Sequence, residues 1–425
     1  MDERRATVMG LGSFGGGAGA VRHLCALGCD VLVTDMAPAE KLTSSLEAIR
    51  DLVDSGAVTL RLGEHNVSDF TTCDLLVANP AVKLPWENRF VRAAQAAGVR
   101  VTTEIGLVID ALPESCKVVA VTGSSGKSTT SAMIHAGLKS AGVNALLGGN
   151  IGGSLLGQDI TENATVVLEL SSAMLWWLAQ PGCTERTRFL DVALITNITP
   201  NHVDWHGSVE HYTQSKLNIA QMLKDSGMLL VGPNVDTDHE RAQRLELITS
   251  LPELATPGAH NRVNASAALA ACEALGVDRE RTLASIAEFA GLPHRLELVR
   301  THKGVRWYND SKSTTPEATR LALEALRPAR VHLIVGGSDK GVDLAPIADL
   351  VRQSAALYCI GQTGETIARL AGIEPVGTLS EAVRLAASNA KEGEAVVLSP
   401  GCASFDQFRS FEDRGNQFRD LVHSL

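Results

Sequence analysis

The sequence predicts an α/β protein of about three domains, each built on a doubly wound parallel sheet. The chain has 425 residues, more than a single hydrophobic core usually serves. Apolar runs of strand length alternate with helical stretches. Glycine-rich turns follow two of these runs, as they do where such sheets bind ligands. We expect domains at residues 1–113, 114–293 and 294–425.

The expected strands are short apolar runs separated by helical segments or turns. A linker is expected at residues 111–117, and the central domain should close near residues 291–295. The expected strands lie at residues 6–10, 30–34, 75–78, 99–102, 118–122, 166–170, 192–196, 305–308, 331–335, 357–360 and 395–398.

The most informative segment is VVAVTGSSGKSTT at residues 118–130, where an apolar strand runs into a glycine-rich loop. Such a loop directs backbone N–H groups at phosphate oxygens. Lys127 would neutralise the terminal phosphates, Ser128 would ligate Mg²⁺, and the following helix would present its positive end. Val121 stands where a full P-loop has glycine, so the loop has a shorter form. A plain strand-to-helix turn is the alternative, but GKST after a buried strand favours a nucleoside triphosphate.

A second glycine turn, Gly10-Leu-Gly-Ser-Phe-Gly15, follows the first strand, and Asp35 ends the next one. This spacing matches the dinucleotide fingerprint, in which the acidic residue binds a ribose hydroxyl. It suits a nucleotide-sugar pyrophosphate equally well. A turn that only packs a helix on a strand remains the alternative.

Polar residues also lie where the central strands end. Glu169 stands inside an apolar run, where a carboxylate is costly unless it meets a cation, and Mg²⁺ is the natural partner beside a phosphate loop. His202 follows the strand at 192–196, at the expected site edge. Lys216 falls in an expected helix, and its spacing alone would make it a surface lysine.

Composition excludes several classes. The 48 Asp and Glu outnumber 38 Lys and Arg, for a net charge of −10, which argues against nucleic acid as a partner. With 5 Trp, 3 Tyr and 9 Phe, extensive base-stacking surfaces are not expected. The eight cysteines form no C-x-x-C pair, so reduced thiols are the default. No apolar leader and no run of about 18 apolar residues is found. We therefore expect a cytoplasmic protein without a membrane segment.

Together these motifs are similar to those of the Mur ligases of bacterial cell-wall synthesis, nearly end to end. The resemblance implies a Rossmann-like N-terminal domain that binds UDP, a central P-loop ATPase-like domain with a parallel sheet, and a Rossmann-like α/β C-terminal domain. It rests on GSSGKST (123–129), GGNIGG (148–153), LELSS (168–172), NITPNHVD (197–204), YTQSK (212–216), AHNRVNA (259–265), GLPHRLE (291–297), YNDSKST (308–314), GGSDKG (336–341) and SPGCASFDQF (399–408).

The resemblance also implies the role of individual residues. Lys216 matches a lysine that the family carbamylates with CO₂, which would let it ligate a second Mg²⁺. The implied catalytic residues are Lys127, Glu169, His202 and Lys216, and the implied metal ligands are Ser128, Glu169 and Lys216 as its carbamate. The implied ATP-binding residues are Gly123, Ser124, Ser125, Gly126, Lys127, Ser128, Thr129, Asn264, Arg295 and Asp310.

Two further groups of residues would bind the other substrates. The residues matching the UDP-substrate site are Gly12, Ser13, Phe14, Gly15, Asp35, Asn79 and Asn150. Those matching the pocket for glutamate are Thr314, Lys340, Ser404 and Phe411. The chain departs from the family at Ser125 and Thr315, where asparagine is usual.

The resemblance implies a monomeric, ATP- and Mg²⁺-dependent ligase that adds glutamate, expected as the D isomer, to UDP-N-acetylmuramoyl-L-alanine through an acyl phosphate in peptidoglycan precursor synthesis. A related ligase adding L-glutamate or another amino acid is an alternative. A folylpolyglutamate-synthase-like ligase is another, but it would not need the N-terminal nucleotide-type domain. A nicotinamide oxidoreductase would leave GKST, Glu169 and Lys216 without a purpose, and a P-loop switch would need no glutamate pocket.

Overall fold

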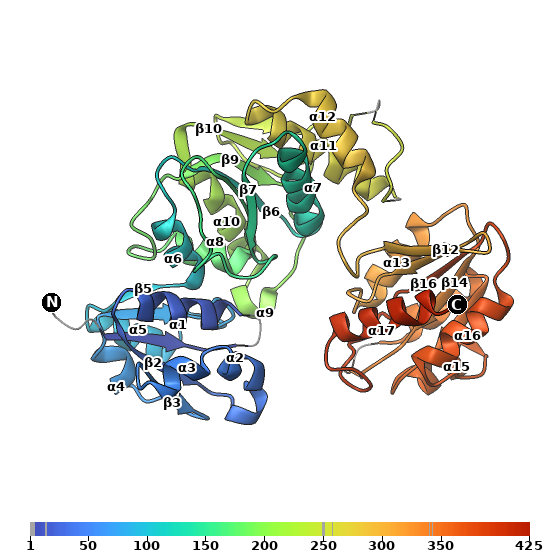
Figure 1. The fold of residues 1–425 in the computed structure, drawn as a ribbon, viewed down its shortest axis with the longest axis horizontal. Coiled ribbons are helices and arrows are strands. Elements are labelled where there is room, and N and C mark those ends of the chain that lie inside the picture. The colour runs from blue at the N-terminus through green and yellow to red at the C-terminus, as the bar shows by residue number, and fades with distance from the viewer. Residues whose placement is uncertain (1–4, 13–14, 249–250, 257, 340, 342) are drawn as a thin grey trace. The chain divides into compact units, whose positions relative to one another are not determined.

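The computed structural model describes residues 5–12, 15–248, 251–256, 258–339, 341 and 343–425. It contains three β-sheets, each accompanied by helices (Figure 1). The predicted residues Ser13, Phe14 and Lys340 lie outside the described residues. In the part of the chain that is described, none of the helices combines the length and apolar character needed to cross a membrane.

The first sheet is entirely parallel, with strand order β3-β2-β1-β4-β5. The strand order reverses between β1 and β4, the point where doubly wound sheets bind ligands. Its strands are β1 (Arg5–Met9), β2 (Asp30–Asp35), β3 (Val58–Leu62), β4 (Leu75–Ala78) and β5 (Arg100–Thr102). Its helices are α1 (Gly16–Ala26), η1 (Ala39–Lys41), α2 (Thr43–Glu47), α3 (Arg50–Asp54), α4 (Ser68–Thr71), α5 (Arg89–Ala96) and α6 (Glu104–Ala111).

The second sheet is also parallel, with strand order β11-β10-β9-β6-β8-β7. Its strands are β6 (Lys117–Thr122), β7 (Ala145–Gly149), β8 (Thr165–Glu169), β9 (Leu190–Ile195), β10 (Leu223–Val231) and β11 (Ala242–Arg244). Its helices are α7 (Lys127–Ser140), α8 (Ser172–Leu178), α9 (Val203–His206), α10 (Val209–Leu217) and η2 (Asn218–Met222), followed along the chain by α11 (Ala259–Ala274) and α12 (Arg279–Glu288).

The first two sheets belong to one compact unit, formed by residues 1–249 and 264–286. One apolar core runs through both, from Phe70 and Ile105 in the N-terminal domain to Val118 and Val166 in the central one. The first two sheets therefore pack around a shared apolar core. The second compact unit, residues 250–263 and 287–425, holds the third sheet.

The third sheet has strand order β12-β13-β16-β14-β15, and it differs from the all-parallel prediction at one edge. β12 runs antiparallel to β13, because Lys303 and Gly304 join them in a hairpin with φ of +51° and +75°. Two positive φ angles mark the tight turn that matches strand twist. The strands are β12 (Glu297–His302), β13 (Val305–Asn309), β14 (Val331–Val335), β15 (Ala356–Cys359) and β16 (Ala395–Leu398). The helices are α13 (Pro316–Ala325), α14 (Ala345–Ala348), η3 (Asp349–Arg352), α15 (Gly364–Ala371), α16 (Leu379–Asn389) and α17 (Phe411–His423).

The eleven predicted strands are all present, and their bounds agree to within two residues. The prediction missed β3, β7, β10, β11 and β12. Thr315, the departure from the usual asparagine, caps α13: its side chain accepts a hydrogen bond from the Ala318 N–H at 3.4 Å. A hydroxyl in this position satisfies a free amide at the helix start.

Candidate active site

The loop between β6 and α7 is held by residues that follow β9, its neighbour in the sheet. Asn197 Oδ1 accepts hydrogen bonds from the Ser125 N–H at 3.1 Å and from the Ser125 hydroxyl at 3.2 Å. The Ser124 N–H donates to the Asn197 carbonyl at 2.9 Å. Ser125, the other departure from the family, thus turns its hydroxyl back toward the β9 loop.

Glycine is required at Gly126, the residue that caps α7. Its φ is +79°, and a Cβ at this position would lie 2.4 Å from the Asn264 Oδ1. Asn264 is buried and lies against the loop. The structure therefore places Asn264, which is predicted to bind ATP, directly beside the loop between β6 and α7.

The first turn of α7 carries three predicted ATP-binding residues, Lys127, Ser128 and Thr129. The Lys127 ammonium folds back and donates to the Ser124 carbonyl at 3.3 Å. Ser128 is buried, and Thr129 is half-buried. The N-terminal N–H groups of this 14-residue helix and its dipole favour an anion. Together they form a cradle of the kind that a phosphate needs.

Glu169 ends β8, directly beside β6, and its side chain is 1% exposed. Its Oε1 accepts a hydrogen bond from the Asn150 amide at 3.0 Å. Its Oε2 is buried and has no hydrogen-bond partner within the described residues. A buried carboxylate oxygen of this kind is costly unless a cation or a donor meets it. The donor set therefore fits a hard divalent cation such as Mg²⁺.

Lys216 is not a surface lysine, because its side chain lies 2% exposed in α10. Its Nζ donates to the Gly123 carbonyl at 2.8 Å and lies 3.4 Å from the Thr122 Oγ1. Burial and the charge of Lys127 lower the pKa of Lys216 to about 6, although Glu169 acts in the opposite direction. At neutral pH the amine is therefore mainly uncharged.

His202 lies close to both lysines of the site. Its backbone is left-handed, with φ of +50°, at the start of α9. Burial of the ring and then the charges of Lys127 and Lys216 lower the pKa of His202. The imidazole is therefore biased toward its neutral form.

The sequence analysis did not identify His206 and His211 as part of this region of the structure. His206 Nδ1 and His211 Nδ1 lie 2.9 Å apart, and His206 Nε2 lies 2.9 Å from the Ser172 hydroxyl. Burial, followed by the neighbouring histidines and Lys216, lowers the pKa of His206 to about 4. The sequence DWHGSVEHY contains both histidines, but only the packing of α9 on α10 brings them together.

In the N-terminal domain, three predicted UDP-site residues converge at the carboxyl ends of β1, β2 and β4. The Gly12 N–H donates to Asp35 Oδ2 at 3.4 Å, and Asp35 Oδ1 accepts from the Ala37 N–H at 2.8 Å. The Asn79 amide donates to the Gly10 carbonyl at 3.2 Å. The structure thus brings the glycine turn, Asp35 and Asn79 to one edge of the first sheet.

A contact between the two domains of this unit lies near the loop that carries Asn150. The Ser154 hydroxyl donates to Glu104 Oε1 at 2.5 Å, and Glu104 begins α6 of the N-terminal domain. Burial raises the pKa of Glu104. This hydrogen bond connects the loop holding Asn150, and through it Glu169, to the N-terminal domain.

Of the predicted ATP-binding residues in the second unit, Asp310 follows the carboxyl end of β13, whereas Arg295 precedes β12. Asp310 is buried, and its two oxygens accept hydrogen bonds from the Leu296 N–H at 3.1 Å and the Ser399 hydroxyl at 2.7 Å. Burial raises the pKa of Asp310 to about 6. Arg295 is exposed, one residue before Leu296.

The three described residues of the predicted glutamate pocket differ in exposure. Ser404 is buried, whereas Thr314 and Phe411 are half-buried. The Phe411 ring packs edge-on against His294, with centroids 6.0 Å apart, and the Lys312 ammonium lies 5.4 Å from its centre. Phe411 therefore contacts both an imidazole and an ammonium group.

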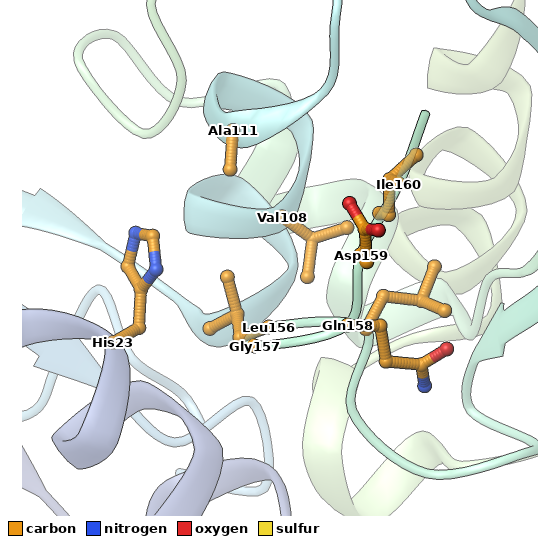
Figure 2. Close-up of a pocket in the computed structure, with 9 residues that line it drawn as sticks. His23, Val108, Ala111, Leu156, Gly157, Gln158, Asp159 and Ile160 are labelled. Carbon is orange, nitrogen blue, oxygen red and sulfur yellow. The ribbon is translucent and has the colours of Figure 1, made fainter. Parts of the chain in front are cut away.

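A pocket of about 340 Å³ lies in the first unit, near the last turns of α1 and α6 (Figure 2). It is walled by His23, Val108 and Ala111 and by the chain from Leu155 to Ile160. None of these is a predicted site residue. This pocket is therefore distinct from the predicted phosphate-binding site.

The fold and the site define an α/β protein with a phosphate loop and a buried carboxylate beside it. Comparison with family models places the protein in a more specific class. The Mur ligase MurD-like N-terminal domain matches residues 4–103, the Mur ligase middle domain matches 121–250, and the Mur ligase glutamate ligase domain matches 294–402. The chain therefore belongs to the Mur ligase family, whose members are ATP-dependent amide-bond ligases.

Relatives agree with this assignment over the full chain. A UDP-N-acetylmuramoylalanine–D-glutamate ligase of Symbiobacterium thermophilum is 35% identical, with 100% of this chain and 98% of the relative covered. The enzyme of the same name from Escherichia coli K12 is also 35% identical, with 87% and 89% covered. The predicted ligase class is confirmed, which excludes a nicotinamide oxidoreductase and a non-catalytic switch.

Solved structures share the fold at lower identity. UDP-N-acetylmuramate-alanine ligase of Thermotoga maritima aligns with a TM-score of 0.63 at 19% identity, covering 99% of both chains. A complex of Escherichia coli FolC with DHPP and ADP aligns with a TM-score of 0.53 at 19% identity, covering 75% of this chain and 92% of FolC. The three-domain α/β architecture is thus confirmed.

Gly126→Ala is expected to weaken ATP binding by at least about 10-fold, because the new methyl would displace Asn264 and the left-handed backbone would be strained. Gly142→Ala is the matched control: its φ is +81° just beyond α7, and nothing lies within 4 Å of the added Cβ. Calorimetric titration with ATP and Mg²⁺ should show normal affinity for the control. An equal loss of ATP affinity in Gly126→Ala and Gly142→Ala would contradict a glycine requirement specific to the phosphate loop.

His206 gives a pH prediction. Its pKa is about 4 in the folded chain, whereas an unfolded histidine titrates near 6.5. Between about pH 6.5 and pH 4 the unfolded chain binds a proton that the folded chain excludes, so the free energy of unfolding should fall as pH falls through this window and level off below it. In urea titrations, His206→Gln should reduce this slope, whereas exposed His423→Gln should not. An unchanged slope in His206→Gln would show that the imidazole titrates normally.

Proposed function

We propose that this chain forms an amide bond between the alanyl carboxyl of UDP-N-acetylmuramoyl-L-alanine and the amine of D-glutamate, converting ATP to ADP and phosphate. The observation that carries the proposal is the cluster of the phosphate loop, Glu169 and Lys216 at one sheet edge. The names of the full-length relatives and the MurD-like N-terminal model support the choice of substrates.

The chemistry follows from the carboxylate, which cannot lose oxide to an amine until it carries a leaving group. The alanyl carboxylate attacks the γ-phosphorus of ATP, giving an acyl phosphate and ADP. The glutamate amine then attacks the acyl carbon, and phosphate leaves as the amide bond forms. Lys127 and the N–H groups of the loop neutralise and orient the phosphates, which is the main requirement of phosphoryl transfer.

Ser128 and Glu169 are the residues that would hold Mg²⁺, and the unpartnered Oε2 of Glu169 supports this assignment. When bound, Mg²⁺ would neutralise charge on the phosphates. We further propose that Lys216 becomes a carbamate: its neutral amine attacks CO₂, a nitrogen–carbon bond forms and a proton is released. The resulting anion would serve a second Mg²⁺. The low pKa of Lys216 supports this step, because only the free amine is nucleophilic.

The remaining substrate contacts are proposals at the positions predicted from the sequence. Gly12, Gly15, Asp35 and Asn79 would bind the UDP group, and Asn150 would contact the substrate beside Glu169. Thr314, Ser404 and Phe411 would bind glutamate, together with Lys340. Arg295 and Asp310 would contact ATP. The domain limits, the monomeric state and the cytoplasmic location also remain predictions.

Turnover assays with purified protein test the proposal. ADP and phosphate should be released only when UDP-N-acetylmuramoyl-L-alanine, D-glutamate, ATP and Mg²⁺ are all present. L-Glutamate, other amino acids and a pteroate acceptor should give little or no release. A preference for L-glutamate or for the pteroate acceptor would favour the related Mur-type or folylpolyglutamate-type alternative.

Lys216→Ala should be nearly inactive, because the position would lose both the amine and its carbamate, and formate or acetate should partly restore turnover. Lys139→Ala, at an exposed position near the end of α7, is the matched control and should keep wild-type turnover. Removing CO₂ from the buffer should lower wild-type activity, and bicarbonate should restore it. Wild-type turnover in Lys216→Ala would disprove the carbamate role.

A further inference from the structure

One arginine in the second unit is buried completely. Arg414, in α17, is 0% exposed, which is rare for a guanidinium without a carboxylate partner. Within the described residues no carboxylate lies within ion-pair distance of it. Burial lowers the pKa of Arg414 to about 10, so the side chain remains charged at neutral pH.

The guanidinium instead donates to groups in two loops. Nε donates to the Ser311 hydroxyl at 3.0 Å, and Nη2 donates to the Ser311 carbonyl at 2.9 Å. Nη2 also donates to the Cys402 carbonyl at 3.1 Å, and Nη1 donates to the Ala403 carbonyl at 3.0 Å. Ser311 follows β13, and Cys402 and Ala403 follow β16, the neighbouring strand.

A third loop joins the same centre. The Ala403 carbonyl also accepts from the Ser338 N–H at 2.9 Å, and Ser338 follows β14. A Cβ on Gly337 would lie 3.0 Å from Arg414 Nη1 and 2.0 Å from the Ala403 carbonyl oxygen. The loop after β14 therefore packs directly on the guanidinium and its acceptor.

Asp406 connects the loop after β15, the fourth parallel strand, to the loops around Arg414. Its Oδ1 accepts from the Ser338 hydroxyl at 3.3 Å, and its Oδ2 accepts from the Gln362 N–H at 2.8 Å. Gln362 follows β15. The carboxyl-end loops of all four parallel strands of the third sheet are thus joined by hydrogen bonds around Arg414 and Asp406.

The residues proposed to bind glutamate are attached to this centre. Ser404 directly follows Ala403, and Thr314 lies three residues after Ser311. The Ser311 hydroxyl, which accepts from Arg414, donates in turn to the Phe411 carbonyl at 2.8 Å. A shift of the guanidinium would therefore move three of the four proposed contacts together.

We propose that Arg414 is a positioning residue for the amino acid substrate: its planar fork of donors fixes the loops that carry Thr314, Ser404 and Phe411. Stability alone does not require it, because apolar residues of similar volume often replace buried charged groups without loss. A fork with five fixed donor directions sets the orientation of several carbonyls at once, and lysine cannot reproduce it. The proposal rests on the proposed function, because the amino acid pocket is part of that function.

Arg414→Lys keeps the charge and removes the fork. We expect it to raise KM for D-glutamate by about 10-fold or more, the effect of losing one or two charge-assisted hydrogen bonds. KM for ATP and for the UDP substrate should change by less than about 2-fold. Acyl phosphate formation, trapped by borohydride reduction without glutamate, should persist. Arg419→Lys is the matched control, since Arg419 lies on the same helix but pairs with Glu297, and it should leave all three KM values unchanged.

An unchanged KM for D-glutamate in folded Arg414→Lys, or a loss of acyl phosphate equal to the loss of turnover, would overturn the proposal. If Arg414→Lys shows no cooperative thermal transition, Ser311→Ala decides. This variant removes only the hydroxyl between Arg414 and Phe411, and it should raise KM for D-glutamate about 3- to 10-fold; an unchanged KM would overturn the proposal. Absence of glutamate-dependent ADP release in the wild-type protein would instead refute the proposed function.

Discussion

The burial of the Glu169 carboxylate, with one oxygen left unpartnered, is the constraint on which the central site depends. A lysine nearby could have satisfied that oxygen, and Lys216 is close enough to influence it electrostatically. Instead its Nζ donates to the Gly123 carbonyl, and burial keeps the amine mainly neutral at pH 7. Glu169 therefore keeps a free lone pair beside the phosphate loop. An internal ion pair would have removed both the proposed metal ligand and the neutral amine that is proposed to attack CO₂.

Parallel topology brings the groups together, and each sheet then fixes its loops by different means. In the first sheet, the side chains of Asp35 and Asn79 hydrogen-bond to the glycine turn. In the second, Asn197 from the neighbouring strand holds the phosphate loop. In the third, the charged side chain of Arg414 extends from a helix into the loop cluster. The same edge of each sheet carries these loops because parallel strands all end at that edge, and ligands of doubly wound sheets bind beyond the carboxyl ends of the strands.

Local patterns made most strands and the phosphate loop predictable. The missed strands lacked such patterns: β7 ends in two glycines, and the first residue of β10, Leu223, is followed by the polar run Lys224, Asp225 and Ser226. The turn at Lys303 and Gly304 could have indicated the antiparallel β12, because glycine in a two-residue turn favours a hairpin. Tertiary packing decided the other differences. Spacing made Lys216 a surface residue, and nothing in FEDRGNQF indicates that Arg414 is fully buried, because burial depends on loops about 100 residues away in sequence.

The pattern of charge at the phosphate loop also bears on turnover. Burial lowers the pKa of His206 to about 4 and that of Lys216 to about 6, and it lowers the pKa of His202 as well. Before Lys216 takes its proposed carbamate form, three basic side chains are thereby biased toward their neutral forms beside a loop that must release ADP as well as bind ATP. If all three were protonated, the cluster would hold substrate and product phosphates alike, and such uniform binding does not accelerate the chemical step. Lys127 and the N-terminus of α7 then supply the positive charge that meets the phosphates. This charge is concentrated where the transferred phosphoryl group must lie.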